Sequence, residues 1–102
     1  METTTKEKVY ELLNAIPYGK VVTYGDIAAA LGNKKLARVV GNILHQNEDV
    51  LTYPCYKVVT AKGELSQSYA FGGIEGQESL LRKEGIEVIN QKVDLNKFRF
   101  IY

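Results

Sequence analysis

The sequence is poor in the residues that form disulfides and metal sites. Its 102 residues include one cysteine, Cys55, and one histidine, His45. A single cysteine cannot form a disulfide within the chain, and one cysteine with one histidine cannot make a structural zinc site of the usual type. We therefore expect no metal, and a reducing intracellular compartment, which is the cytoplasm or, in a eukaryote, the nucleus.

A long apolar run is also missing. No stretch approaches the about 20 consecutive apolar residues that span a membrane. The first residues, Met1 to Lys8, are polar and rich in threonine and do not resemble a signal peptide. We expect a soluble protein with no membrane partner, and the length fits one domain with a modest core, placed over residues 1–102.

The chain as a whole has almost no net charge, but its middle third carries an excess of positive charge. The formal net charge of +1 does not by itself indicate nucleic-acid binding. Within residues 17–47 the charged side chains are Lys20, Lys34, Lys35 and Arg38 against the single acidic Asp26. A solvated basic surface and a footprint for DNA phosphates both fit this concentration of positive charge.

Two short helices are predicted before residue 33. Thr4 followed by Glu7 is typical of a capping box that starts a helix over residues 5–16. The β-favouring run of residues 20–23 precedes a second, alanine-rich helix that begins at Thr23 or Tyr24 and ends at Gly32, where glycine suits the left-handed cap. The residues of this second helix expected to face the core are Ile27, Ala30 and Leu31.

A third helix is predicted from Asn33, a good N-cap, to about Gln46. Its apolar stripe is Leu36, Val39, Val40, Ile43 and Leu44, and its outer face is Arg38, Gly41, Asn42 and His45. Glycine in mid-helix costs about 1 kcal/mol relative to alanine, so Gly41 is best explained if another body approaches the backbone there. The helix pair is typical of a helix-turn-helix, although pairs of short helices also occur as ordinary core elements.

The second half of the sequence predicts a small β-hairpin and one more helix. Val58 and Val59 favour a strand, residues 61–63 a hairpin turn, and residues 65–69 the return strand. A last helix is expected over about residues 74–84, and residues 86–102 are expected to close the fold, with the last few mobile. The fold class is therefore mainly α with a small β-hairpin, a winged helix-turn-helix-like single domain.

The stretch from Tyr53 to Val59 holds the cysteine. Pro54 fixes its own φ near −65°, so the backbone bends here in a defined way and the side chain of Cys55 starts from a fixed position. A lone cysteine beside apolar residues is, however, more often an inert buried residue than a nucleophile.

Four segments together resemble the O6-alkylguanine-DNA alkyltransferases, also called methylated-DNA–protein-cysteine methyltransferases, with their alkyltransferase-like relatives. In the family's order these are residues 16–32 (IPYGKVVTYGDIAAALG), 37–44 (ARVVGNIL), 54–59 (PCYKVV) and 80–85 (LLRKEG). The resemblance implies a DNA repair protein that rotates an alkylated guanine out of double-stranded DNA and takes the alkyl group onto a cysteine once. It implies no cofactor, and we expect a monomer.

The resemblance also implies roles for residues of the DNA-binding surface. Tyr24 resembles the tyrosine that meets the target phosphate, and Arg38 resembles the arginine that replaces the flipped base in the stack. Gly41 fits the small surface on which the groove lies. Lys34, Lys35 and Asn42 complete the expected DNA-binding set.

The same resemblance assigns the active site. Cys55 is similar to the alkyl acceptor and Glu84 to the family's carboxylate. Asn47 resembles the asparagine that braces the turn before the active-site motif. The remaining residues expected to form the substrate pocket are Pro54, Tyr69 and Phe71.

Two positions depart from the family's pattern. Tyr56 stands where the family has a histidine that relays the thiol proton, and Lys57 stands where arginine is usual. Tyrosine, with a reference pKa of about 10, is a poor base for a thiol near 8.5, although Lys57 would lower the thiol's pKa if it lay on the same side. Three functions stay open: alkyl transfer with Tyr56 in the catalytic set, non-enzymatic lesion binding that recruits downstream repair proteins, and DNA or protein interaction without lesion preference.

Overall fold

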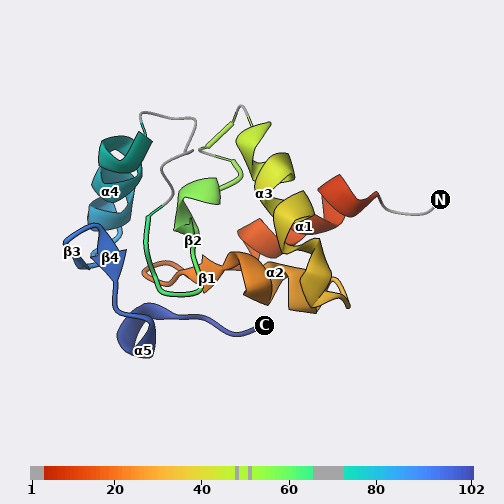
Figure 1. The fold of residues 1–102 in the computed structure, drawn as a ribbon. Helices are drawn as coiled ribbons and strands as arrows, with labels where there is room; N and C mark the ends of the chain where they lie inside the picture. Colours follow the sequence, from red (N-terminus) through yellow and green to blue (C-terminus); the bar gives the residue numbers. More distant parts are fainter. Residues whose placement is uncertain (1–3, 48, 51, 66–72) are drawn as a thin grey trace.

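The computed structural model describes residues 4–47, 49–50, 52–65 and 73–102 of the chain. Within these residues the fold is mainly helical with two pairs of short strands, in agreement with the predicted fold class (Figure 1). The elements in chain order are α1 (Thr5–Asn14), β1 (Val22–Thr23), α2 (Tyr24–Ala30), η1 (Lys34–Leu36), α3 (Ala37–His45), η2 (Cys55–Lys57), β2 (Val58–Val59), α4 (Gly73–Lys83), β3 (Val88–Ile89), β4 (Lys92–Val93) and α5 (Leu95–Phe98).

The first two helices begin and end close to where the sequence predicts. The hydroxyl of Thr4 accepts a hydrogen bond from the backbone N–H of Glu7 at 3.1 Å and caps α1, which ends two residues earlier than expected. Helix α2 begins at Tyr24 and ends before Gly32, whose φ of +97° is the left-handed conformation that glycine tolerates. Ala30, expected in the core, is exposed.

The third helix differs from its prediction at its start. The side chain of Asn33 does act as a cap, but it caps the 3-10 turn η1, and α3 begins only at Ala37. A 3-10 turn has 3.0 residues per turn instead of 3.6, so it shifts the faces of the helix that follows. Within α3, Val40 and Leu44 are buried, whereas Val39, expected on the apolar stripe, is 41% exposed.

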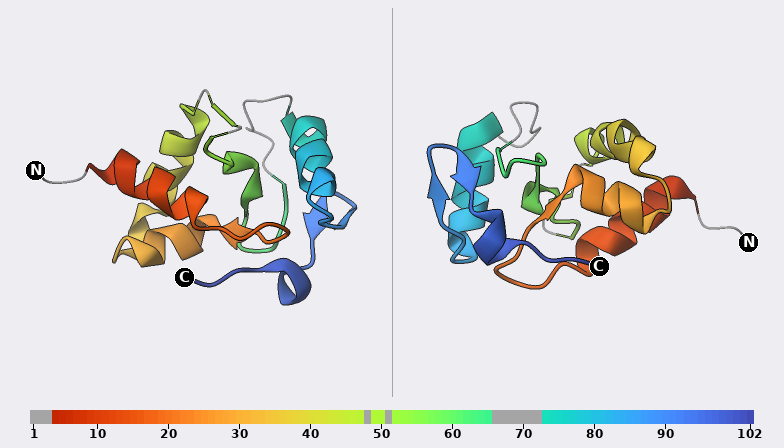
Figure 2. Two further views of the ribbon diagram at one scale, coloured as in Figure 1. Left: turned by 180° about the vertical axis from the view of Figure 1, so that it is seen from behind. Right: turned by 60° about the horizontal axis from the view of Figure 1, so that its bottom comes forward.

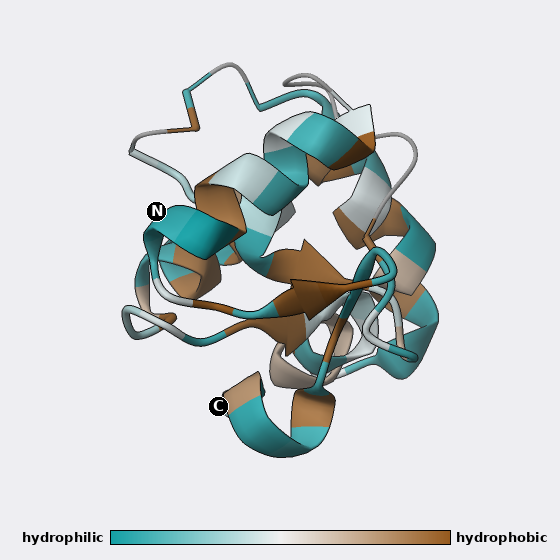
Figure 3. Cartoon of the chain, turned by 90° about the vertical axis from the view of Figure 1, so that its left-hand side faces the viewer, coloured by the Kyte–Doolittle hydropathy of each residue, from teal (hydrophilic) through white to brown (hydrophobic). Residues whose placement is uncertain are grey.

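A parallel pair of strands separates two hydrophobic cores. Val22 lies opposite Val58 in β1–β2, and both side chains pack with α1, α2 and α3. Their neighbours Val21 and Val59 pack instead with Leu81 of α4 and with the β3–β4 hairpin. Successive side chains of a strand point to opposite faces, so this short pair serves both cores at once. The strands in the middle of the view in Figure 3 are accordingly hydrophobic.

The predicted hairpin over residues 58–69 is wrong in its position. The turn at residues 60–63 forms, with Gly63 N–H donating to the Thr60 carbonyl at 2.8 Å, but β2 pairs in parallel with β1. The hairpin is β3–β4, whose turn residues Asn90 and Gln91 both have positive φ, as a tight two-residue turn requires. Within the expected return strand, Leu65 bonds to the Gln91 carbonyl, and residues 66–69 lie outside the described residues.

The C-terminal segment is hydrogen-bonded to the rest of the molecule as far as its last residue. The N–H of Val21 donates to the Phe98 carbonyl at 2.8 Å, and the N–H of Phe100 donates to the Val21 carbonyl at 2.7 Å. The hydroxyl of Tyr102 donates to the Leu12 carbonyl of α1 at 2.7 Å. Figures 1 and 2 show this segment running alongside β1 towards α1.

Candidate active site

Cys55 lies where the two cores meet. It begins the 3-10 turn η2 directly after Pro54, whose φ is −76°, and its N–H donates to the Tyr53 carbonyl at 2.7 Å. The cysteine is 5% exposed and packs with the first core, whereas the next residue, Tyr56, packs against the second. The tight turn thus points neighbouring side chains towards different halves of the molecule.

The loop before the cysteine is held by Asn47, which is 3% exposed. Its amide nitrogen donates to the Tyr53 carbonyl at 2.8 Å, and its amide oxygen accepts from the N–H of Asp49 at 3.0 Å. The ring of Tyr53 stacks on that of Tyr10 in α1 with 4.4 Å between centroids. These contacts fix the approach of the chain to Pro54.

Glu84, directly after α4, accepts hydrogen bonds from three donors that come from two other parts of the chain. One carboxylate oxygen accepts the hydroxyl of Tyr56. The other accepts the ammonium of Lys57 at 2.8 Å and the N–H of Gly19 at 3.0 Å. Lys57 also donates to the Pro17 carbonyl at 2.9 Å. The cluster therefore joins η2, the end of α4 and the turn that follows α1.

The charges of this cluster fix the protonation of Tyr56. Burial, and then the hydrogen bond to the Glu84 carboxylate, raise the pKa of Tyr56 well above its ordinary value of 10. Burial alone would raise the pKa of Glu84, but hydrogen bonds from Lys57, Tyr56 and Gly19 hold that pKa below its ordinary value. Tyr56 therefore keeps its proton at neutral pH, and its neutral phenol is a weaker proton acceptor than an imidazole.

Lys57 is directed to Glu84 and the Pro17 carbonyl. Its side chain is 4% exposed, so the positive charge is desolvated and depends on these partners. The sequence left open whether this lysine would face the thiol, and the structure shows its ammonium bound to the carboxylate instead. In the sequence, a lysine next to apolar residues indicates that a buried acidic partner lies nearby, because a lysine is almost never fully buried unless it is paired.

Gln77 of α4 is a site residue that sequence reasoning missed. Its side chain is fully buried, and its amide nitrogen donates to the carbonyls of Tyr56 at 3.0 Å and Val58 at 3.1 Å. It thereby ties the end of η2 to α4. The available signal was a polar residue on the inward face of an amphipathic helix.

The residues expected to meet DNA lie on α2, η1 and α3. Arg38, Asn42, Lys34 and Lys35 are exposed, and Tyr24 is half-buried at the start of α2. A Cβ atom added to Gly41 would lie 3.9 Å from a ring carbon of Tyr24, so the ring of this tyrosine is what approaches the helix backbone there. Tyr69 and Phe71, expected in the pocket wall, lie outside the described residues.

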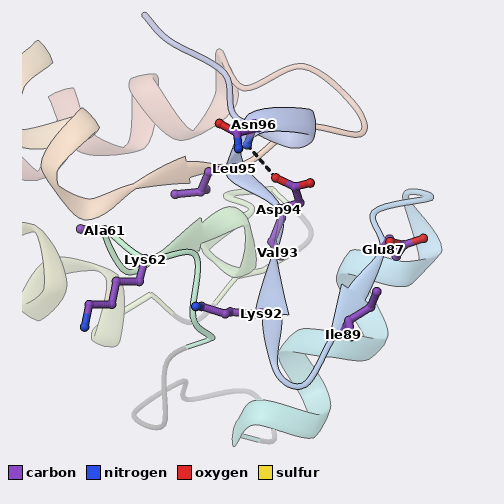
Figure 4. Close-up of a pocket in the computed structure, with 9 residues that line it drawn as sticks. All are labelled: Ala61, Lys62, Glu87, Ile89, Lys92, Val93, Asp94, Leu95 and Asn96. Atoms are coloured by element: carbon purple, nitrogen blue, oxygen red, sulfur yellow. Dashed lines mark hydrogen bonds between the residues drawn. The ribbon is translucent and has the colours of Figure 1, made fainter.

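A separate hollow of about 460 Å³ lies between the β3–β4 hairpin, the start of α5 and the turn at residues 61–62 (Figure 4). No residue predicted for the active site lines it. Among the described residues, no helix is long and apolar enough to cross a membrane. In the same part of the chain, no group of three histidine, cysteine or acidic side chains is placed to hold a metal ion.

Comparison with known proteins decides the family. The sequence model described as "6-O-methylguanine DNA methyltransferase, DNA binding domain" matches residues 4–86. The chain belongs to this methyltransferase family. The match includes the cysteine motif, Glu84 and the whole predicted DNA-binding set.

Relatives and solved structures of this family differ in length and in name. A "Bifunctional methyltransferase/endonuclease" of Picrophilus torridus is 46% identical over 90% of the chain, which covers 30% of that protein. A "Methylated-DNA--protein-cysteine methyltransferase" of Methanosarcina acetivorans is 40% identical over 81% of the chain and 52% of its own length. The chain thus spans about half or less of these relatives. The crystal structure of S. pombe Atl1 in complex with damaged DNA containing O6-carboxymethylguanine matches over 100% of both chains, with a TM-score of 0.88 and 30% identity.

Proposed function

We propose that this protein repairs DNA by rotating an O6-alkylguanine out of the duplex and transferring the alkyl group irreversibly to Cys55. The observation that carries the proposal is Cys55 itself, held at the start of η2 beside the Tyr56–Glu84 pair, in the place of the family's acceptor. Membership of the methyltransferase family supports it. The protein acts as a monomer on double-stranded DNA and needs no cofactor.

The transfer is a displacement at saturated carbon. The sulfur of Cys55 forms a bond to the alkyl carbon, the bond from that carbon to O6 breaks, and the thiol proton ends on the departing guanine. Only the thiolate is a good nucleophile, so the thiol gives its proton to water before the attack, and the departing guanine takes a proton from water. Transfer without a positioned base typically costs a factor of about 10² to 10⁴ in rate. A protein used once tolerates such a slow step.

The DNA-facing side chains supply the energy that flipping requires. Extruding a base costs a few kcal/mol of stacking and pairing. In our proposal Arg38 fills the space left in the stack, Tyr24 meets the target phosphate, and Lys34 and Lys35 attract neighbouring phosphates. Exposure of Arg38 and both lysines on η1 and α3 supports this division of roles.

The direct test is mass spectrometry of the Cys55 peptide after incubation with a duplex that carries one O6-methylguanine. We expect one added methyl group on this peptide, and none when the duplex is undamaged. Cys55→Ser is the control, and it should bind the lesion without gaining mass. Tight binding of the wild type with an unmodified Cys55 after prolonged incubation would rule out transfer.

Arg38→Ala tests base replacement. Its affinity for the O6-methylguanine duplex should fall by roughly tenfold, with a smaller loss on undamaged duplex, because the flipped state loses its wedge. The measurement is a binding titration of both duplexes at several salt concentrations. Lys35→Ala is the matched control, since loss of a phosphate contact should weaken both duplexes equally and lower the salt slope by about 1. Equal affinity of the wild type for both duplexes would instead favour an interaction module without lesion preference.

A second candidate is a lesion-binding protein that performs no transfer and recruits other repair proteins. Tyr56 favours it, because its raised pKa leaves the site without a base. The full-length match to S. pombe Atl1, solved with DNA containing O6-carboxymethylguanine, also favours it. The name of the Picrophilus torridus relative makes an endonuclease a reasonable kind of downstream factor.

A further inference from the structure

The first turn of α2 is built around the carboxylate of Asp26. The N–H of Asp26 donates to the Thr23 hydroxyl at 3.0 Å, and the N–H of Thr23 donates back to Asp26 Oδ2 at 2.9 Å. This reciprocal capping box satisfies two N–H groups at the start of the helix. Tyr24, the first residue of α2, lies between the two capping residues.

The same carboxylate is held from the other end of the chain. Arg99 Nε donates to Asp26 Oδ2 at 3.0 Å, and Arg99 Nη2 donates to the second oxygen, Oδ1. Burial alone would raise the pKa of Asp26, but hydrogen bonds from Arg99 and Thr23 hold the pKa below its ordinary value. A two-pronged arginine–carboxylate pair fixes orientation as well as charge.

Arg99 itself is set in place by the backbone. Val21, just before β1, donates to the Phe98 carbonyl and accepts from the Phe100 N–H, so hydrogen bonds flank Arg99 on both sides. The Asp26 side chain is 11% exposed and that of Arg99 39% exposed. The pair is thus a fixed brace between the C-terminal segment and α2.

The position of Tyr24 in turn depends on this first turn. Its ring lies against Gly41 of α3, the helix that presents Arg38, so a shift of the α2 start would move the tyrosine across the surface expected to meet DNA. The family resemblance assigns no DNA-binding role to any residue after Gly85. The brace therefore links a segment without an assigned function to the binding surface.

We propose that Arg99 is a positioning residue for DNA binding. Through Asp26 it fixes the first turn of α2, and thereby places the Tyr24 hydroxyl for its phosphate. The inference rests on the DNA contact of Tyr24 in the proposed function. Because the guanidinium is engaged by Asp26, Arg99 does not itself contact a phosphate, and this separates a positioning role from a basic footprint.

The test is a binding titration on an O6-methylguanine duplex over a range of salt concentrations, in a Cys55→Ser background that prevents transfer. Arg99→Gln should lower the affinity about fivefold, the upper end of what loss of a partly exposed ion pair costs, with an unchanged salt slope. A salt slope reduced by about 1 would show a direct phosphate contact and overturn the proposal. Arg99→Lys should recover only part of the affinity, because lysine cannot form the fork, and full recovery would contradict it.

Coupling to Tyr24 is the readout that a merely structural role would not change. In a Tyr24→Phe background, Arg99→Gln should cause no further loss of affinity, and additive losses would overturn the inference. Asp26→Asn, which keeps a capping oxygen but loses the ion pair, should reproduce the effect if Arg99→Gln folds poorly. Arg82→Gln is the matched control, because it also removes an arginine paired with a carboxylate, Glu78. An equal loss of affinity in this control would show that the effect of Arg99→Gln comes only from the change in net charge.

Different results would contradict the proposed function and the positioning role of Arg99. Failure of the wild type to prefer the alkylated duplex would contradict the proposed function alone. The coupling between Arg99 and Tyr24 concerns a phosphate and is also measurable on undamaged duplex. Independent effects of the two substitutions on both duplexes would contradict the positioning role alone.

Discussion

Tyr56 is the residue on which the chemistry of this site depends. It stands where the family resemblance leads us to expect a histidine, and its hydroxyl donates to the Glu84 carboxylate. Burial, and then this hydrogen bond, raise the pKa of the phenol, so Tyr56 holds its proton at neutral pH.

Replacing Tyr56 by histidine should restore the missing base. Tyr56→His is expected to raise the single-turnover rate of methyl transfer at neutral pH by about 10². The rate is measured by quenching the reaction with a methylated duplex at successive times. Tyr56→Phe is the matched control, and because the tyrosine does not act as a base, its rate should stay within a few-fold of the wild type. A large fall in Tyr56→Phe would show that the hydroxyl takes part in the reaction.

At the scale of elements, Glu84 fastens the end of α4 to η2 and to the turn after α1. Its partners Lys57 and Gly19 come from η2 and from the turn after α1, and in that turn the Tyr18 hydroxyl also donates to the Lys83 carbonyl at 3.0 Å. The ion pair is almost fully buried, with side-chain exposures of 4% for Lys57 and 11% for Glu84. Breaking such a pair from one side leaves a buried charge without compensation.

Glu84→Gln is therefore expected to lower the free energy of unfolding by about 3 kcal/mol at neutral pH. The folded-state pKa of Glu84 is below its unfolded value, so its stabilisation is present above the unfolded pKa and is lost as the pH falls through the folded pKa. The difference between variant and wild type should thus shrink below about pH 4. Urea unfolding at a series of pH values measures this, and a constant difference would contradict the assigned charge state.

The elements that the sequence predicts well are those whose signals are local. The cap at Thr4 and the glycine stop at Gly32 each lie within a few residues of the helix end that they determine. The pairing of β2 with β1 brings together residues about 36 apart in the chain, and no local pattern shows it. For the same reason the sequence located Cys55 and Glu84 through family motifs but missed Gln77, whose role exists only once α4 packs on η2.

At the scale of the whole molecule, the site lies at the junction of two cores. Cys55 belongs to the first core with the helices that carry Tyr24 and Arg38, whereas Glu84 follows α4 of the second. The C-terminal segment crosses between them and ends on α1 (Figure 1). The residues proposed to bind DNA and the proposed acceptor thus lie with the first core, and Glu84 reaches the site from the second.

In the proposed function this chain takes up one alkyl group and is then spent. The stoichiometry of transfer is measured with a duplex whose O6-methyl group is isotopically labelled, followed to completion with DNA in excess. We expect a plateau at one label per chain, carried by Cys55. A chain that saturates with damaged DNA while the label remains entirely on the duplex would rule out transfer.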